Sequence, residues 1–377
     1  MGVSTKISLG IDARVLFRKN LRGIGRYLKN IVQLSPQDFE IVLYGEKEFE
    51  NEFSISIPNN VKIKTFNLKG YRFQTWEQIG LPFHMVIKKH NLFFSPANTV
   101  PLIQPCKTVI TLHDAHLWLS RDHNILNWYY LKLVPRALKK VDYVITISHF
   151  SKEELLKIFP FLQNRIEVIY HGIEPIFKPN IPFFSEKISN NIKVKKPYLL
   201  YIGGESSKKQ PNFMLELFAK IQKKFPHISL IMLGISENAR DRFYAKAKNK
   251  YNIQYGLFIS PPVSDDVLAM LYSNATAVLY PTLHEGFGFP ILEAMASKVP
   301  ILASNVASIP EISGNYAFLL SPNNVLRWEQ LLIDIINNRY DLNNSQLESA
   351  HNWAKKFSWQ MCVNKTYEVF RKIVRGN

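Results

Sequence analysis

Residues 277–303 read AVLYPTLHEGFGFPILEAMASKVPILA, and this stretch decides the fold. The apolar run at 277–280 predicts a buried strand, residues 289–296 predict a helix, and residues 300–303 predict a second buried strand. Strands covered on both faces need near-continuous valine, isoleucine and leucine, and alternation of strand and helix indicates a parallel sheet. The stretch therefore predicts an α/β unit built on parallel strands.

The same alternation extends outward along most of the 377-residue chain. In the first half, apolar runs predict strands over residues 6–14, 40–45, 61–66, 92–95, 107–113, 142–148 and 166–171. In the second half they predict further strands over residues 198–202, 227–233, 300–303 and 317–320, and a short one ending at 259. An apolar stripe from Ile24 to Val32 predicts a helix after the first strand, and Ser151 with Glu154 has the spacing of a capping box that would open another.

One stretch interrupts the alternation. Residues 175–197 contain four prolines and no clear period, which is typical of a linker. The chain is also longer than one compact domain usually is. We therefore expect two Rossmann-like, doubly wound domains, one over residues 1–175 and one over 197–356, joined by a linker over 176–196.

Charge is the compositional outlier. The net charge is +17, with +8 in residues 1–175 and +9 in the remainder. Such a field suits anionic partners, namely nucleotide diphosphates, phospholipid surfaces, phosphorylated glycans or nucleic acid, although a solvated basic surface without a partner explains it equally well. A nucleic-acid-binding protein would need a clustered basic face with exposed aromatic residues. Here the excess is even and the aromatic residues mostly fall on apolar stripes, so we expect no nucleic-acid partner.

The sequence gives no sign of export or of a membrane span. No apolar run reaches the roughly 18 residues that a spanning helix needs, and the first ten residues run into a predicted strand. The two cysteines, Cys106 and Cys362, have neither metal-ligand spacing nor a disulfide framework. We expect a cytoplasmic protein.

Candidate site residues follow predicted strands, where ligands of parallel sheets bind. Arg22 to Arg26 (RGIGR) places Gly25 at a helix start, where backbone N–H groups suit an anion, although an ordinary tight turn has the same pattern. His113, with Asp114, ends the strand at 107–113 and could hold a sugar hydroxyl or a leaving phosphate; a packed, hydrogen-bonded histidine is the alternative.

The turn after the strand at 198–202 combines glycines and lysines. Gly203 and Gly204 are followed by Lys208 and Lys209 just before a predicted helix, a pattern that suits a diphosphate but is also that of a solvated basic turn. The Walker A pattern is absent.

The opening stretch carries two carboxylates. Glu285 precedes a flexible turn, and Glu293 lies eight positions further, inside the next helix. Two such groups would suit a polyhydroxylated ligand. Solvated surface is the alternative for any glutamate, but a glutamate among Ile291, Leu292 and Met295 is costly to bury unpaired.

Residues 281–296 (PTLHEGFGFPILEAMA) resemble the signature of the GT-B retaining glycosyltransferases of family 4. Weaker similarity covers essentially the whole chain, including residues 23–27, 111–114, 142–148, 170–173 and 357–359. The resemblance implies two Rossmann-like domains facing across a cleft, with helix 357–377 packing back on the first domain. It also implies a mannosyltransferase-like enzyme that moves a hexose, with retention of configuration, to a glycan or lipid-linked acceptor in lipopolysaccharide or surface polysaccharide synthesis.

The resemblance also implies residue roles. The donor would be GDP-mannose or a UDP-sugar, and His113 and Glu285 would be the catalytic residues. The implied diphosphate ligands are Lys209, Lys208, Gly25, Gly203 and Gly204, and the implied sugar and nucleotide ligands are Glu285, Gly286, Phe287, Gly288 and Glu293. His171 departs from the asparagine of many relatives, and Lys298 from their glycine.

The sequence contains no Asp-x-Asp, so we expect no metal and no other cofactor. Lysines and helix N-termini would then neutralise the diphosphate. A two-domain sugar- or nucleotide-binding protein without catalysis and a phosphorylase-like GT-B enzyme are the alternatives. The aromatic and basic residues of 116–140 suggest peripheral contact with an anionic membrane, or equally a core helix with a basic face.

Overall fold

The computed structural model describes residues 6–17, 21, 23–46, 56–66, 73–119, 128–184, 196–338 and 344–376. The chain divides into two compact units, which we call unit 1 (Met1–Gly172 with Ser358–Asn377) and unit 2 (Ile173–Phe357). Three parts of the sequence predictions lie outside the described residues: Arg22, residues 120–127 and residues 185–195 of the predicted linker.

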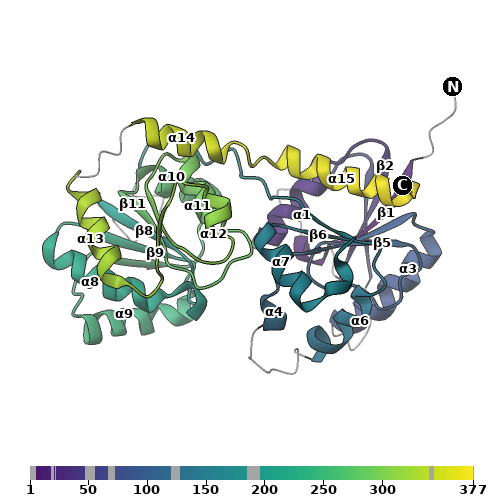
Figure 1. Ribbon diagram of the computed structural model, residues 1–377, viewed down its shortest axis with the longest axis horizontal. Coiled ribbons are helices and arrows are strands. Elements are labelled where there is room, and N and C mark those ends of the chain that lie inside the picture. The colour runs from purple at the N-terminus through teal and green to yellow at the C-terminus, as the bar shows by residue number, and fades with distance from the viewer. Residues whose placement is uncertain are drawn as a thin grey trace. The chain divides into compact units, whose positions relative to one another are not determined.

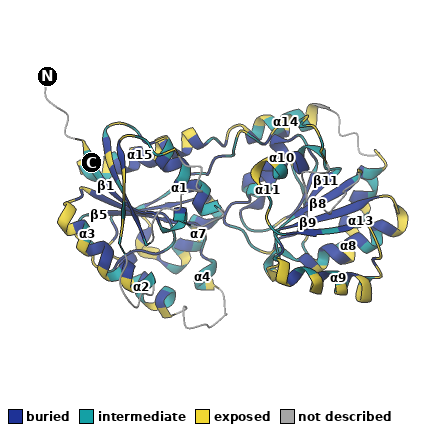
Figure 2. Ribbon diagram, turned by 180° about the vertical axis from the view of Figure 1, so that it is seen from behind, coloured by how far each residue is buried: buried dark blue, intermediate teal, exposed yellow. Residues whose placement is uncertain are grey.

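Unit 1 is a seven-stranded parallel sheet with the strand order β3-β2-β1-β4-β5-β6-β7. Its strands are β1 (Ile7–Asp12), β2 (Phe39–Gly45), β3 (Val61–Thr65), β4 (Leu92–Ser95), β5 (Lys107–Leu112), β6 (Tyr143–Thr146) and β7 (Ile166–Val168). The interior strands are buried along most of their length because helices cover both faces of the sheet (Figures 1 and 2).

The helices of unit 1 include two π-helical turns. The α-helices are α1 (Gly23–Gln33), α2 (Phe73–Thr75), α3 (Leu81–Lys88), α4 (His116–Leu119), α6 (Val134–Leu138), α7 (His149–Ile158) and α15 (Trp359–Arg375). The π turns are η2 (Trp76–Gly80) and η3 (Tyr129–Leu133), and short 3-10 turns are η1 (Arg14–Phe17) and η4 (Pro160–Leu162). π-helical turns are rare and are often found at functional sites.

Unit 2 is a six-stranded parallel sheet with the order β10-β9-β8-β11-β12-β13. Its strands are β8 (Tyr198–Ile202), β9 (Ser229–Leu233), β10 (Leu257–Ser260), β11 (Ala277–Tyr280), β12 (Ile301–Ser304) and β13 (Phe318–Leu320). Helices again lie on both faces of the sheet (Figure 1): α8 (Pro211–Lys224), α9 (Glu237–Tyr251), α10 (Asp265–Asn274), α11 (Phe289–Ala296), α12 (Ile309–Ser313), α13 (Val325–Ile336) and α14 (Asn344–Ala354), with the 3-10 turn η6 (Ser207–Lys209). The prediction of two parallel-sheet α/β domains is confirmed.

The C-terminal helix α15 belongs to unit 1, beside α1 (Figure 1). The Tyr367 hydroxyl donates to the carbonyl of Ile31 (3.0 Å), and the Arg371 guanidinium forms two hydrogen bonds with Asp38 (2.8 and 2.9 Å). A Cβ at Gly172 would lie 2.1 Å from the backbone nitrogen of Trp359, so only glycine permits this close approach of the two chain segments.

Local predictions needed three corrections. The first strand ends at Asp12 and not at residue 14, because Arg14 turns into η1. Helix α7 begins before Ser151: Ser148, which lies two residues after β6 with an extended backbone, accepts the Ser151 N–H (3.1 Å) and is the N-cap. The sequence interpretation also did not foresee the helical stretch over residues 73–88.

Candidate functional site

In unit 2, the segments that follow the adjacent strands β8 and β11 converge at the carboxyl ends of these strands. Lys209 follows β8 and Glu285 follows β11, and the Lys209 ammonium forms an ion pair with the Glu285 carboxylate. Both side chains are mostly buried, with 18% and 13% of their surface exposed. The structure therefore brings together one predicted diphosphate ligand and one predicted sugar ligand.

Tyr280 and Thr282 complete this cluster. The Lys209 ammonium donates to the Tyr280 hydroxyl (2.9 Å), and the Thr282 hydroxyl donates to the Glu285 carboxylate (2.9 Å). Burial by itself would raise the pKa of Glu285, but the charge and hydrogen bond of Lys209 outweigh it and hold this pKa below its usual value. Burial and the nearby Glu285 carboxylate raise the pKa of Tyr280. Lysine and glutamate therefore face each other charged, with a neutral tyrosine beside the lysine.

The glycines of the 203–209 turn are required by close packing. The Tyr201 hydroxyl donates toward the carbonyls of Gly204 (2.9 Å) and Lys209 (3.0 Å), and a Cβ at Gly203 would lie 2.4 Å from that hydroxyl. Gly204 has a φ of +71°. The Lys208 carbonyl accepts the Leu283 N–H (2.7 Å), which ties the turn to the segment after β11.

The loop from Glu285 to Gly288 is held by one serine. The Ser308 hydroxyl lies within hydrogen-bonding distance of the carbonyls of Glu285 (2.9 Å) and Phe287 (3.0 Å). Phe287 is buried, and Gly288 has a φ of +106° at the N-cap of α11. This anchoring fixes the loop, Gly286 included, directly before the helix.

Glu293 lies in the second turn of α11 and is 3% exposed. The Tyr272 hydroxyl donates to its carboxylate (2.6 Å). The charge of Glu293, like that of Glu285, raises the pKa of Tyr280. The structure thus brings Lys209 and Glu285 together beside Tyr280 and holds Glu293 against Tyr272, and the roles of these residues toward a ligand stay predictions.

His113 and Gly25 lie in unit 1. The His113 Nε2 lies 2.7 Å from the Pro96 carbonyl, which can only accept, so Nε2 donates and Nδ1 accepts from His171 Nε2 (3.3 Å). Tyr27 of α1 contacts both rings, and Gly25 lies in the first turn of that helix. His113 is only 6% exposed, and burial lowers its pKa, so it is a neutral, packed histidine.

Sequence comparisons decide the family. The family model for glycosyl transferases group 1 matches residues 183–356, and that for glycosyltransferase family 4 matches residues 22–176. The chain is a family 4 glycosyltransferase. The predicted family resemblance is confirmed, and the two parallel-sheet units of this glycosyltransferase are those of the GT-B fold.

Individual relatives of the glycosyltransferase have related names. It is 25% identical to the O-antigen chain mannosyltransferase B of Escherichia coli over 70% of each chain. It is 27% identical to the O-antigen chain mannosyltransferase RfbU of Salmonella typhimurium, over 79% of this chain and 84% of that protein. The solved structure of Anabaena HepE in complex with UDP-glucose matches with a TM-score of 0.72 and 15% identity, over 97% of this chain and 99% of that one.

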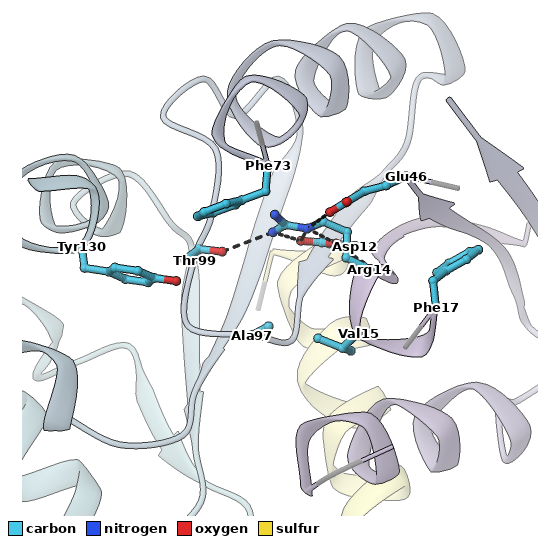
Figure 3. A pocket seen from close by; sticks show the side chains of 9 residues that line it. All are labelled: Asp12, Arg14, Val15, Phe17, Glu46, Phe73, Ala97, Thr99 and Tyr130. Atoms are coloured by element: carbon cyan, nitrogen blue, oxygen red, sulfur yellow. Dashed lines mark hydrogen bonds and ion pairs between the residues drawn. The ribbon is translucent and has the colours of Figure 1, made fainter. Parts of the chain in front are cut away.

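Unit 1 of the glycosyltransferase also contains a pocket that sequence reasoning missed. It lies at the carboxyl end of its sheet around Asp12, Arg14 and Glu46, with a volume of about 350 Å³ (Figure 3). A signal was present, because a charged Asp-x-Arg pair ends an apolar strand. Glu77 and Thr99, which hold Arg14, could not be found from the sequence because they are 63 and 85 positions away from it.

Among the residues that the structure describes, no group of three or more histidine, cysteine, aspartate or glutamate side chains could hold a metal ion. No helix in the described ranges is both long enough and apolar enough to span a membrane.

Proposed function

We propose that this glycosyltransferase moves a hexose, with mannose first in order of preference, from a nucleotide-diphosphate sugar to a hydroxyl of a glycan or lipid-linked acceptor in surface polysaccharide or lipopolysaccharide synthesis. The names of the O-antigen mannosyltransferases support mannose and the polysaccharide acceptor. The UDP-glucose bound by HepE supports a nucleotide-sugar donor. GDP-mannose is therefore the first candidate donor, and UDP-sugars follow.

The observation that carries this proposal is the cluster of Lys209, Glu285 and Tyr280. An ammonium and a carboxylate that neutralise each other can each exchange their partner for part of one ligand. In the proposed complex, Lys209, with Lys208 nearby, binds the diphosphate, while Glu285 accepts hydrogen bonds from sugar hydroxyls. Gly203 and Gly204 allow the backbone to approach the phosphates, and Glu293 exchanges its tyrosine partner for the ribose hydroxyls.

We further propose that the reaction proceeds with retention and without a metal or other cofactor. The positive charge of Lys209 and Lys208 acts on the leaving diphosphate, where negative charge develops in the transition state. The leaving phosphate helps to deprotonate the acceptor hydroxyl. His113 and the N-terminal turn of α1 at Gly25 are proposed to act beside the donor sugar. His113 would then act through its position and dipole, because its ring is neutral.

The experiment is a donor panel on the full chain. GDP-mannose, UDP-glucose and UDP-galactose are offered in turn, and melting temperature and nucleotide release are measured. The donor should raise the melting temperature by linkage and should release its nucleoside diphosphate. No shift and no release with any donor would contradict the proposal. In a separate reaction with an acceptor added, a proton spectrum of the glycoside product tests retention. Strict dependence of the rate on a divalent cation after EDTA treatment would overturn the metal-free mechanism.

The same panel separates the alternatives. A binding protein without catalysis would show the thermal shift without nucleotide release. A phosphorylase-like enzyme would release a sugar 1-phosphate from a glycan when inorganic phosphate is supplied, and would do so without a nucleotide.

Peripheral contact with an anionic membrane, on the cytoplasmic face, is also proposed, but not through the aromatic residues of 116–140. Trp118 and Tyr129 of that segment are packed inside unit 1, and of its described aromatic residues only Trp128 is largely exposed. A run of exposed apolar side chains lies instead on η2 and α3. These are Ile79, Phe83, Val86 and Ile87, each 53–63% exposed, and they lead into Lys88 and Lys89.

An apolar face beside lysines fits an anionic lipid surface. Flotation with vesicles containing phosphatidylglycerol should recover the chain, and Phe83→Glu should abolish the recovery. Equal recovery with zwitterionic vesicles, or a dimer that Phe83→Glu dissociates, would overturn this part.

A further inference from the structure

The pocket of unit 1 lies where a parallel sheet binds ligands. Asp12 ends β1, Glu46 directly follows β2, and Thr99 follows β4. From β1 the chain continues to β2 on one side, and from β4 it continues to β5 on the other side, so the boundary between β1 and β4 is the topological switch point of the sheet. The volume of about 350 Å³ lies at the lower end of the range for small-molecule sites, roughly 300–1,000 Å³.

One guanidinium forms the centre of the pocket (Figure 3). Arg14 bonds to Asp12 through Nε (3.0 Å) and Nη2 (2.6 Å), and Nη2 also lies 2.6 Å from the Glu77 carboxylate. The guanidinium lies over the rings of Phe73 and Trp76, with centroid distances of 5.4 and 5.0 Å. Burial alone would lower the pKa of Arg14, but the carboxylates of Asp12 and Glu77 outweigh burial and raise it, so the group stays charged.

The arrangement is rigid because two π-helical turns hold it. Glu77, which is fully buried, comes from η2, and the Tyr129 hydroxyl donates to it from η3. The Gln78 amide bonds to the Tyr129 hydroxyl (2.6 Å), and its oxygen accepts the Leu102 N–H (2.8 Å). A network of this kind fixes the direction in which Arg14 presents its remaining donors.

Some of the polar capacity of the pocket is not used by the part of the chain that the structure describes. Among the described residues, no hydrogen bond reaches Nη1 of Arg14, and the Glu46 carboxylate has only a 3.9 Å contact with Arg14 Nε. Phe73 and Tyr130 provide aromatic walls (Figure 3). A donor and an acceptor without a hydrogen bond to any described residue, together with aromatic faces, match a sugar ring, which has hydroxyls at its edge and C–H groups on its face.

The charge of the pocket restricts which sugar fits. Three carboxyl groups, those of Asp12, Glu46 and Glu77, surround one guanidinium. Burial raises the pKa of Glu77, but even with Glu77 protonated two carboxylates face one cation. The pocket is therefore acidic although the whole chain carries +17. A phosphate or uronate in it would meet like charge.

We infer that this pocket binds an uncharged sugar ring of the acceptor and rejects acidic sugars, with Glu46 and Arg14 as specificity-determining residues. The inference rests on the proposed function, because it names the class of acceptor for that reaction. Glu46 binds the sugar hydroxyls, and Asp12 and Glu77 hold Arg14 in position.

Saturation-transfer NMR on the full chain tests the inference. Excess UDP and GDP are present so that the donor site is occupied. The probes are methyl α-mannopyranoside, methyl α-glucopyranoside, mannose 6-phosphate and methyl α-glucuronide. At least one uncharged glycoside should show transfer, and the two acidic sugars should show at least tenfold less. Equal transfer to acidic and uncharged sugars, or transfer to none, overturns the inference.

Two variants test whether the sugar binds in this pocket. Glu46→Gln keeps the size and an acceptor oxygen but removes the charge, so it should reduce the tenfold discrimination to about twofold or less. Glu40→Gln is the matched control, since Glu40 is an exposed residue of the same strand β2 and does not line the pocket. If Glu46→Gln leaves the discrimination intact, the assignment fails. The donor panel is measured without acceptor, so failure here is distinct from failure of the proposed function.

Discussion

The Lys209 ammonium and the Glu285 carboxylate form an ion pair within unit 2, although 76 positions separate them in the sequence. The pair exists because β8 and β11 are adjacent strands, so that the segments after their carboxyl ends meet. In the proposed reaction each group exchanges the other for part of the donor. In that proposal, the charges of this pair serve binding and catalysis.

Lys209→Ala should reduce kcat/KM by roughly 30- to 800-fold, the equivalent of about 2–4 kcal/mol of transition-state stabilisation for one electrostatic donor. Steady-state nucleotide release measures the effect, and the melting temperature shows that the chain still folds. Lys208→Ala is the matched control. Lys208 acts on Glu285 by charge only, whereas Lys209 also donates a hydrogen bond to it, so the control should lose less than about tenfold. A near-wild-type rate for Lys209→Ala, or equal losses in the two variants, would refute the assignment.

Tyr272→Phe should lower the free energy of unfolding by about 1–3 kcal/mol, because it removes the hydrogen bond to the buried Glu293 carboxylate. If Glu293 binds the nucleotide, the variant should also alter the KM for the donor. Chemical denaturation and donor titration give the two values. Tyr198→Phe removes a buried hydrogen bond to the carbonyl of Leu271 instead (2.8 Å), so it should affect stability only. If the two variants have the same KM for the donor, the assignment of Glu293 to donor binding is wrong.

Gly204→Ala should destabilise the 203–209 turn by about 1–3 kcal/mol. Its φ of +71° is unfavourable for alanine, and the new Cβ would lie 2.9 Å from the Gly234 carbonyl oxygen. Gly376→Ala isolates the first effect, since Gly376 has a φ of +76° with nothing within 4 Å of the added Cβ. Thermal unfolding should therefore show a larger loss for Gly204→Ala, and equal losses would mean that contact with Gly234 is unimportant.

Stability should fall as the pH drops below about 6.5, the ordinary pKa of histidine. Burial lowers the pKa of both His113 and His171 in the folded chain, and the charge of His113 lowers that of His171 further. The unfolded chain therefore takes up protons first, so stability that is present above pH 6.5 is lost progressively below it. Each such group contributes up to about 1.4 kcal/mol per pH unit.

His171→Asn separates this effect from general acid sensitivity. The asparagine amide still offers a donor to His113 but does not titrate, so the free energy of unfolding should fall less steeply between pH 6.5 and 5.5. His227, which is exposed, gives the control: His227→Asn should keep the wild-type slope. If the free energy of unfolding falls with pH equally steeply in the wild type and in His171→Asn, then His171 is not held in its neutral form in the folded chain.

The sequence by itself determined the class of fold, because burial of parallel strands on both faces imposes a local apolar pattern that is visible in most of the strands, although not in the edge strand β3. Several predicted bounds, such as 198–202 and 277–280, agree with the structure residue for residue. It also marked Lys209, Glu285 and Glu293 as unusual, since charged residues beside apolar runs need a reason.

Only the tertiary structure decided which of these residues are in contact, and which of them are buried and charged. Tyr280 became the centre of the unit 2 cluster although a tyrosine that ends a strand carries no signal in sequence. His113 proved to be packed and neutral, which depends on Pro96 and His171, 17 and 58 positions away. The Arg14 pocket depends on two π-helical turns and on Glu77. The physical reason is the same in each case: hydrogen bonds and ion pairs of buried groups are made across strands, and the order of strands in a sheet is not encoded in any local pattern.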